Sequence, residues 1–125
     1  MGEESVRFCR IVTRLIDVFI LSILNGKPQT GYGIRKVLKR TMNVQVSYGL
    51  LYPSLHNLEK IGYIEGRWVA QSKVETLQKK VYRLTPKGRE ALSAYLRYLQ
   101  IIISKLQQTS TQDVKVHYRQ EGLAR

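Results

Sequence analysis

Apolar residues recur every three or four positions over residues 11–24, and this period predicts a helix that ends at Asn25-Gly26. A second helix is expected to start after Thr30, a capping residue, and to run to about Arg40. Its inner face carries Ile34, Val37 and Leu38. This part of the chain therefore predicts two amphipathic helices joined by a short connection.

A third helix is expected after Ser47, and its two faces differ in character. The apolar face has Leu51, Leu55 and Leu58, spaced four and then three residues apart. The opposite face carries Tyr48, His56, Asn57 and Lys60. Gly62 is expected to serve as the C-cap. Pro53 removes one backbone hydrogen bond, so it predicts a slight kink or a late start of this helix.

The pattern changes after Gly62. Residues 63–69 and 80–84 are rich in strand-forming side chains, and a polar loop is expected between them over 70–79. Thr85 and Pro86 then start a helix that should continue to about Gln107. Two strands joined by an exposed basic loop, behind three helices, predict a winged helix-turn-helix. The expected fold class is mainly α with a small two-stranded β wing and a long C-terminal helix.

The expected organisation is a flexible N-terminus over 1–10, the winged domain over 11–84, the C-terminal helix over 85–108 and a polar tail over 109–125. Apolar residues of the C-terminal helix repeat at heptad spacing, and two neighbours widen this seam. The predicted seam comprises Leu92, Tyr95, Leu96, Leu99, Ile102, Ile103 and Leu106. So small a domain offers too little surface to cover the seam along its length, which favours a homodimer. The alternative is that the helix folds back onto the first helix of the same chain.

The net charge of the chain adds most to this structural prediction, because it indicates the kind of partner. The 125 residues include 21 Lys and Arg against 9 Asp and Glu, for a net charge of +12. Such an excess favours a polyanionic partner, most commonly nucleic acid. The alternative is a solvated basic surface without a partner. The hydrophobic content of 43% is ordinary for a globular protein.

Other functional classes find little support in the sequence. The single cysteine, Cys9, excludes an intrachain disulfide and a Cys-based zinc site, and a cytoplasmic location is expected. His56 is interpreted as solvated or phosphate-facing rather than a metal ligand, because His117 is the only other histidine. The most apolar segment, Val18 to Leu24, is too short to span a bilayer. The acids are scattered and no nucleophile–base arrangement is present, so neither an enzyme nor a cofactor is expected.

Three runs of residues together resemble a known family. They are Gly31-Tyr32-Gly33-Ile34, then Ser47-x-Gly49-x-Leu51-Tyr52-Pro53-x-Leu55-x-x-Leu58-Glu59-x-x-Gly62-x-Ile64, and Tyr82-Arg83-Leu84-Thr85-x-x-Gly88. This pattern is similar to that of the PadR-like transcriptional regulators. The resemblance implies a prokaryotic DNA-binding regulator, usually a repressor, that dimerises through its C-terminal helix. Tyr48 and Leu50 depart from the family pattern.

A helix that reads DNA places its first turns in the major groove, where base edges are distinguishable. The predicted recognition residues are Ser47, Tyr48, Gly49, Leu50, Tyr52, His56, Asn57 and Lys60. Tyr52 has a second interpretation as a core residue that supports the wing. The predicted backbone contacts of the second helix are Tyr32, Arg35, Lys36 and Lys39, and those of the wing are Lys73, Lys79 and Lys80. Trp68 and Leu84 are expected in the core.

The leading hypothesis is a regulator, and by family resemblance a repressor, that binds double-stranded DNA in a sequence-specific manner. It would act as a homodimer on a pseudo-palindromic operator. The alternatives are an architectural DNA-binding protein without a preferred site and a winged-helix module for protein–protein interaction. The resemblance allows a small aromatic effector between the dimer helices, but no residue requires one.

Overall fold

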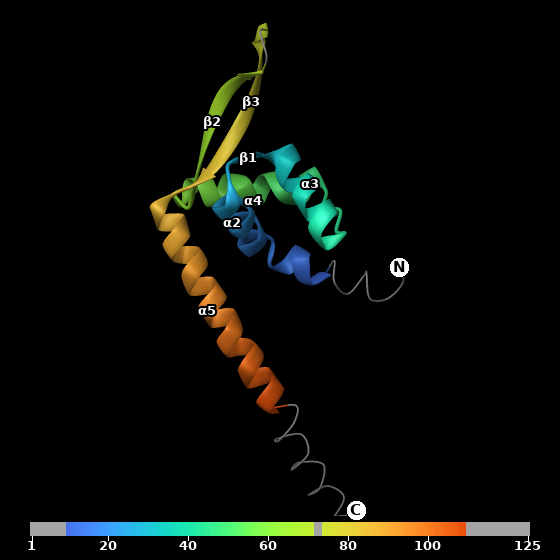
Figure 1. Cartoon of the computed structure of the whole chain (residues 1–125), viewed down its shortest axis with the longest axis vertical. Coiled ribbons are helices and arrows are strands. Elements are labelled where there is room, and N and C mark those ends of the chain that lie inside the picture. Colours follow the sequence, from blue (N-terminus) through green and yellow to red (C-terminus); the bar gives the residue numbers. More distant parts are fainter. Residues whose placement is uncertain (1–9, 72–73, 110–125) are drawn as a thin grey trace, which may run out of the picture. The chain divides into compact units, whose positions relative to one another are not determined.

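The computed structural model describes residues 10–71 and 74–109, and it describes side chains in these ranges except those of residues 71–77. The chain divides into two compact units, Met1–Leu92 and Ser93–Arg125. In the first unit, three helices pack together and a β-hairpin extends from them (Figure 1). This arrangement of helices with a small antiparallel sheet confirms the predicted winged helix-turn-helix class.

The first predicted helix is divided in the structure. Residues 10–14 are helical, Leu15 leaves the helical conformation, and α2 spans Ile16–Gly26. Both sides of the break contribute to the core, because Val12 and Ile16 are buried. Neither Pro nor Gly lies near Leu15, so the sequence pattern carries no signal of this break. The end of the helix at Gly26 is as predicted.

The second and third helices begin where their capping residues predict. Helix α3 spans Gly31–Met42, and the Thr30 hydroxyl accepts a hydrogen bond from the Gly33 N–H at 2.9 Å. Helix α4 spans Tyr48–Lys60, and the Ser47 Oγ accepts one from the Leu50 N–H at 3.2 Å. The late start that Pro53 predicted is therefore wrong, because capping by Ser47 fixes the first turn ahead of the proline.

A turn at Gly62 closes α4. The Gly62 φ of 87° lies in the left-handed region, and the Tyr63 N–H donates to the Leu58 carbonyl at 3.0 Å. Glycine adopts this conformation at little cost, so the predicted C-capping role is confirmed.

The wing is longer than predicted. Strand β2 spans Ile64–Gln71 and β3 spans Val74–Leu84, so most of the loop expected over 70–79 is strand. The two strands pair antiparallel from Ile64 opposite Leu84 outward. Residues 70–79 are mostly polar and show no apolar alternation, so the sequence carries no strand signal over this part of the hairpin.

A short strand that the sequence did not predict completes the sheet. Strand β1 spans Gln29–Thr30 and pairs with Tyr82 and Val81, giving a three-stranded sheet in the order β1-β3-β2. Two residues are too few to produce a period. The pairing ties the start of α3 to the base of the wing.

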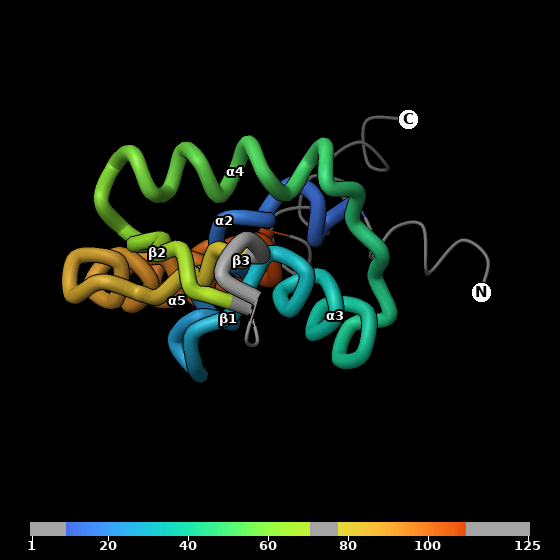
Figure 2. The backbone as a smooth tube through the Cα atoms, turned by 90° about the horizontal axis from the view of Figure 1, so that it is seen from above, coloured from blue at the N-terminus to red at the C-terminus, as the bar shows by residue number. Residues whose placement is uncertain are grey.

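The core lies between the three helices and the base of the sheet, and α2 lies between α3 and α4 (Figure 2). Ile20, Leu21, Ile34, Leu38, Leu51, Leu55, Leu58 and Ile64 are almost completely buried. This set includes every predicted inward residue of the second and third helices except Val37, which is half-buried. The predicted core position of Trp68 is wrong, because its side chain is 64% exposed on the hairpin.

Helix α5 spans Pro86–Gln108 and begins at the base of the wing. The Thr85 hydroxyl accepts a hydrogen bond from the Gly88 N–H at 3.0 Å and donates to the Gly62 carbonyl at 2.6 Å. A Cβ on Gly88 would overlap the Tyr63 carbonyl oxygen, so glycine is required for this close approach.

Only the first part of α5 has a buried apolar residue. Leu92 is buried, whereas Leu96 and Ile103 are 44% and 53% exposed. Tyr95 and Leu99 are half-buried. None of the helices within residues 10–71 and 74–109 has the length and hydropathy of a membrane span.

Candidate nucleic-acid interface

Helix α4 presents one solvent-facing stripe opposite its core face. Tyr48, Tyr52, His56 and Lys60 recur every four residues and are all exposed. Gly49 and Asn57, also predicted recognition residues, are exposed on the same helix. The structure therefore brings most of the predicted recognition residues onto one surface.

Two predicted recognition residues at the start of α4 have other surroundings. Leu50 is half-buried, and its N–H is bound by the capping Ser47 hydroxyl. Gly49 is open, since a Cβ there would meet only Ser47 Oγ, at 3.8 Å. The start of α4 therefore exposes backbone at Gly49.

Tyr48 is held in a stack that joins α3 to α4. The Arg35 Cζ lies 4.0 Å from the centre of the Tyr48 ring, and the Arg35 Nε donates to the Val46 carbonyl at 2.7 Å. On α4, the Tyr48 and Tyr52 rings are 5.4 Å apart with planes 29° from parallel. Arg35 was predicted as a phosphate contact, but here its guanidinium orients Tyr48.

Tyr52 also fixes the approach of α4 to the start of α3. A Cβ on Gly31 would lie 2.7 Å from the Tyr52 hydroxyl oxygen. The Tyr52 side chain is nevertheless 45% exposed. It therefore packs on α3 through its hydroxyl end and presents part of its ring to solvent.

The end of α4 is tied to the wing by Glu59. One carboxylate oxygen lies 2.9 Å from the Lys80 Nζ, and the other accepts a hydrogen bond from the Gly66 N–H at 3.2 Å. The hydrogen bond to Glu59 raises the pKa of Lys80. Lys80 was predicted to face DNA from the wing, whereas its charge is partnered within the protein.

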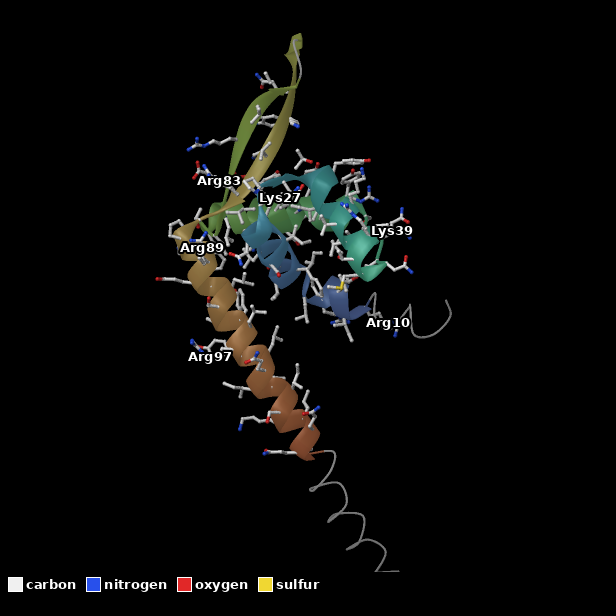
Figure 3. All side chains as sticks on the ribbon, viewed as in Figure 1. Arg10, Lys27, Lys39, Arg83, Arg89 and Arg97 are labelled. Carbon is white, nitrogen blue, oxygen red and sulfur yellow. The ribbon has the colours of Figure 1, made fainter. Side chains whose placement is uncertain are left out.

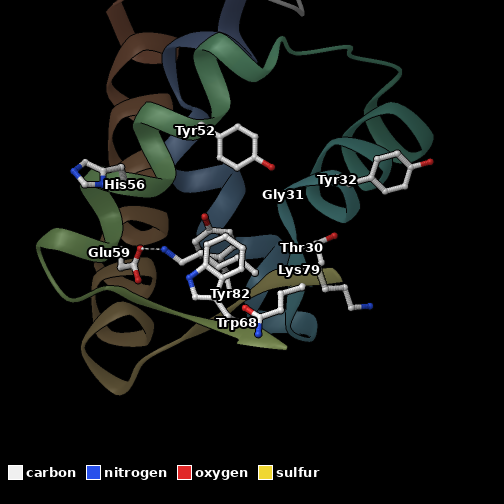
Figure 4. Close-up of a pocket in the computed structure, with 11 residues that line it drawn as sticks. Thr30, Gly31, Tyr32, Tyr52, His56, Glu59, Trp68, Lys79 and Tyr82 are labelled. Atoms are coloured by element: carbon white, nitrogen blue, oxygen red, sulfur yellow. Dashed lines mark hydrogen bonds and ion pairs between the residues drawn. The ribbon is translucent and has the colours of Figure 1, made fainter. Parts of the chain in front are cut away.

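A groove of about 710 Å³, here called the wing groove, lies between α4, the start of α3 and the hairpin. Its lining includes Tyr32 of α3, Tyr52 and His56 of α4, and Trp68, Lys80 and Tyr82 of the hairpin. Tyr52 and Trp68 lie on different sides of it (Figure 4). The Lys80 Nζ lies 5.8 Å from the Trp68 ring centre and 5.4 Å from that of Tyr82. Burial raises the pKa of the Tyr82 hydroxyl.

The predicted wing lysines do not form one cluster. The register pairs Trp68 with Lys80 and Val69 with Lys79. Alternation along a strand therefore places Lys79 and Val69 on the opposite face of the hairpin from Trp68. The Lys79 side chain leads away from Trp68 at the edge of the wing groove (Figure 4). Lys73 lies outside the described residues.

A second hollow, here called the α3 hollow, gathers the predicted backbone contacts of α3. It measures about 190 Å³ and is lined by Tyr32, Arg35, Lys36, Lys39 and Gln45. The Lys36 Nζ lies 5.7 Å from the Tyr32 ring centre. Gln45 was not predicted, because it lies in a connection without any periodic pattern. Tyr32 lines both this hollow and the wing groove.

Basic side chains also occur away from this surface. Lys39 lies on α3, whereas Arg83 and Arg89 lie near the junction of β3 and α5 (Figure 3). Lys87 donates to the Ile61 carbonyl at 2.9 Å, so this lysine supports the turn after α4. Position relative to α4, rather than charge alone, therefore distinguishes the candidate interface.

The sequence matches a family model described as the transcriptional regulator PadR-like family, over residues 20–94. This match covers α3, α4, the wing and the start of α5. A comparison with the curated proteins finds no match.

Several solved structures are similar to this chain. Bacillus subtilis PadR in complex with operator DNA is 28% identical with a TM-score of 0.60, and the match covers 66% of this chain and 46% of that one. A PadR family transcription regulator from Clostridium difficile is 26% identical with a TM-score of 0.65, covering 74% and 95%. A PadR-like transcriptional regulator from Bacillus cereus is 25% identical with a TM-score of 0.66, covering 82% and 97%. The chain thus spans less than half of the Bacillus subtilis protein.

Proposed function

This chain belongs to the PadR-like family of transcriptional regulators, and we propose that it is a repressor that binds one pseudo-palindromic operator as a homodimer. Members of this family are regulators rather than enzymes. The exposed stripe of α4 is the observation that carries the proposal. The opposite face of α4 is fully packed in the core, so the stripe is held in place. The stripe lies beside the basic surface of α3, and the chain has a net charge of +12.

In the proposed complex α4 enters the major groove. Gly49 permits a close approach of the helix start, because no side chain separates its backbone from the DNA. Tyr52 and Asn57 face the bases, and an Asn side chain can pair with the edge of adenine. Tyr48 contributes through its hydroxyl while Arg35 holds its ring in place. Bacillus subtilis PadR, which is similar to this chain, is known in complex with operator DNA, and this supports the choice of an operator as the partner.

Phosphate contacts come from the two sides of α4. Lys36 and Lys39 of the α3 hollow are exposed, and Lys79 makes no ion pair with any residue that the structure describes. Neutralising about six phosphates per dimer gives a slope of roughly −5 for log affinity against log salt concentration. These contacts set the register, and α4 selects the sequence.

The seam of α5 supports the homodimer. Leu96, Ile103 and Leu106 are exposed on this helix at heptad spacing. A two-fold partner would cover them and place two copies of α4 on one side of the duplex, with half-sites about 10 bp apart or a multiple of that. A dimer bound at an operator would then be sufficient for repression. The protein would act in the cytoplasm, where it has access to DNA.

Selection of bound fragments from random duplex DNA tests the proposal. We expect recovery of one two-fold motif, followed by at least about a hundredfold tighter binding to it than to random duplex at matched salt. Equal affinities for both duplexes would instead indicate an architectural protein. Failure to retard any duplex at low salt would favour a protein–protein module.

A further inference from the structure

Trp68 is largely exposed, although tryptophan has the largest side chain and is seldom left uncovered in a folded protein. It is 64% exposed on β2, yet it shares its face of the hairpin with Lys80 and Tyr82. The Lys80 ammonium lies 5.8 Å from the centre of the Trp68 ring and helps to position the indole. Lys80 is in turn held by its ion pair with Glu59. A large aromatic surface that is positioned but uncovered is typical of an interface anchor.

The surroundings of Trp68 continue into a track along the protein. The wing groove runs from Trp68 to Tyr32, and Tyr32 also lines the α3 hollow with Lys36 and Lys39. The track therefore leads from an aromatic section to a basic section, past the exposed ring of Tyr52. Glu59 adds little negative potential, because Lys80 neutralises it.

We propose that this track seats one sugar-phosphate strand of the DNA duplex, with Trp68 as its anchor on the wing. The inference rests on the proposed function and assigns a route to the backbone beside α4. An extended polyanion matches a continuous track that ends in lysines better than a compact ligand does. Deoxyribose packs on the indole face, and the Tyr32 hydroxyl and the α3 lysines bind phosphate oxygens.

Trp68 therefore contributes affinity without reading sequence. Lys80 acts as a positioning residue, because its contacts lie with Glu59, Trp68 and Tyr82 inside the groove. By register Lys79 lies on the opposite face of the hairpin from Trp68, and it lines only the edge of the wing groove.

The chain contains one tryptophan, so its fluorescence reports on Trp68 directly. The experiment titrates the full chain with a selected duplex and with a random duplex, at low salt, and measures quenching of the tryptophan by acrylamide. We expect the quenching constant to fall about twofold with either duplex, because the strand covers one ring face. Gel retardation of the same samples establishes independently that the complexes form.

Two variants complete the test. Trp68→Ala should weaken binding about tenfold for the selected and the random duplex alike, and Trp68→Phe should restore most of the affinity. Val69→Ala is the matched control, because Val69 is also exposed but lies on the other face of the hairpin. It should leave the affinity unchanged within about twofold. Thermal unfolding of each variant checks that the fold is intact.

The outcomes separate this inference from the proposed function. Retarded complexes with unchanged quenching of Trp68, or a Trp68→Ala variant that binds as tightly as the unmodified chain, would overturn the track and leave the regulator standing. A loss confined to the selected duplex would also overturn it, because it would make Trp68 a reader of bases. Absence of any retarded complex would overturn both proposals.

Discussion

The carboxylate of Glu59 and the ammonium of Lys80 lie 2.9 Å apart and join the last turn of α4 to the wing. The same carboxylate holds the Gly66 N–H, so two strands of the hairpin depend on one side chain of α4. A polar link therefore adds to the apolar packing of Ile64 in fixing the orientation of the wing relative to the stripe of α4.

Removing this link should weaken DNA binding more than it weakens the fold. For Glu59→Gln we expect a loss of roughly 1 kcal/mol in the free energy of unfolding, because the pair is partly exposed. Affinity should fall equally for selected and random duplex. Glu65→Gln is the matched control: Glu65 pairs with Arg67 at 2.8 Å in a more exposed position, and both quantities should stay unchanged. Chemical denaturation and DNA titration measure the two effects, and equal behaviour of both variants would contradict the role of Glu59.

The stack of Arg35 on Tyr48 makes a second prediction. Arg35→Lys keeps the charge but removes the planar group that covers the Tyr48 ring and the bond to the Val46 carbonyl. Specific affinity should therefore fall by about tenfold, with little change in non-specific affinity or in the salt slope. Arg40→Lys, on the exposed outer side of α3, serves as the control. A uniform loss on all duplexes would show that Arg35 acts as a phosphate contact.

Gly88 is predicted to tolerate no side chain. In Gly88→Ala the added Cβ would meet the Tyr63 carbonyl oxygen, so the turn after α4 and the start of α5 would have to separate. We expect a loss of about 3 kcal/mol in the free energy of unfolding. Gly26→Ala, where a Cβ would meet nothing within 4 Å, is expected to be neutral within about 0.5 kcal/mol. Similar losses in the two variants would contradict the close approach.

Asp17 predicts a pH-dependent change in stability. Burial raises its pKa above the ordinary value of 3.8, against the opposing effect of a hydrogen bond with Ser54. The folded state therefore holds the proton more tightly than the unfolded state, and this contribution to stability is lost as pH rises above about 4. Asp17→Asn should raise the melting temperature at pH 7, and the gain should shrink towards pH 4. A variant less stable than the unmodified chain at pH 7 would show that the charged form is favoured in the fold.

The seam of α5 predicts the oligomeric state. Ile103→Lys places a charge on the exposed apolar seam and should convert a dimer to a monomer in sedimentation experiments. Specific DNA binding should then weaken by more than about a hundredfold, because two half-sites are no longer read together. Ser104→Lys adds the same charge off the seam and should remain dimeric. A dimer that persists in Ile103→Lys would show that the dimer forms through another surface.

Helices α3 and α4 could be predicted closely from the sequence, whereas the break in the first helix at Leu15 could not. Thr30 and Ser47 mark the starts of α3 and α4, and leucines at four- and three-residue spacing mark the buried face of α4. The length of the wing could not be predicted, because residues 70–79 are mostly polar and show no apolar alternation in the sequence. Strand β1 is too short for any periodic signal.

The candidate interface was predicted less completely than the fold. Periodicity identifies the outward residues of α4, but it does not indicate that Arg35 turns towards Tyr48 or that Glu59 partners Lys80. Both contacts join residues on different elements, and a charged side chain has the same appearance in sequence whether it meets DNA or a neighbour. Trp68 was assigned to the core from its residue type, since exposure on a hairpin leaves no mark in composition.

The contact between Gly31 and the Tyr52 hydroxyl has an evolutionary consequence. A side chain at position 31 would need the space that the tyrosine occupies, so the two positions are not independent. Homologues that acquire a smaller residue at position 52, and with it a different operator, become free to replace the glycine. Where the tyrosine is kept, a side chain at position 31 would require the Tyr52 ring to move. A change of operator preference through position 52 should therefore be accompanied by change at position 31, in the helix proposed to contact phosphates rather than in the helix proposed to read bases.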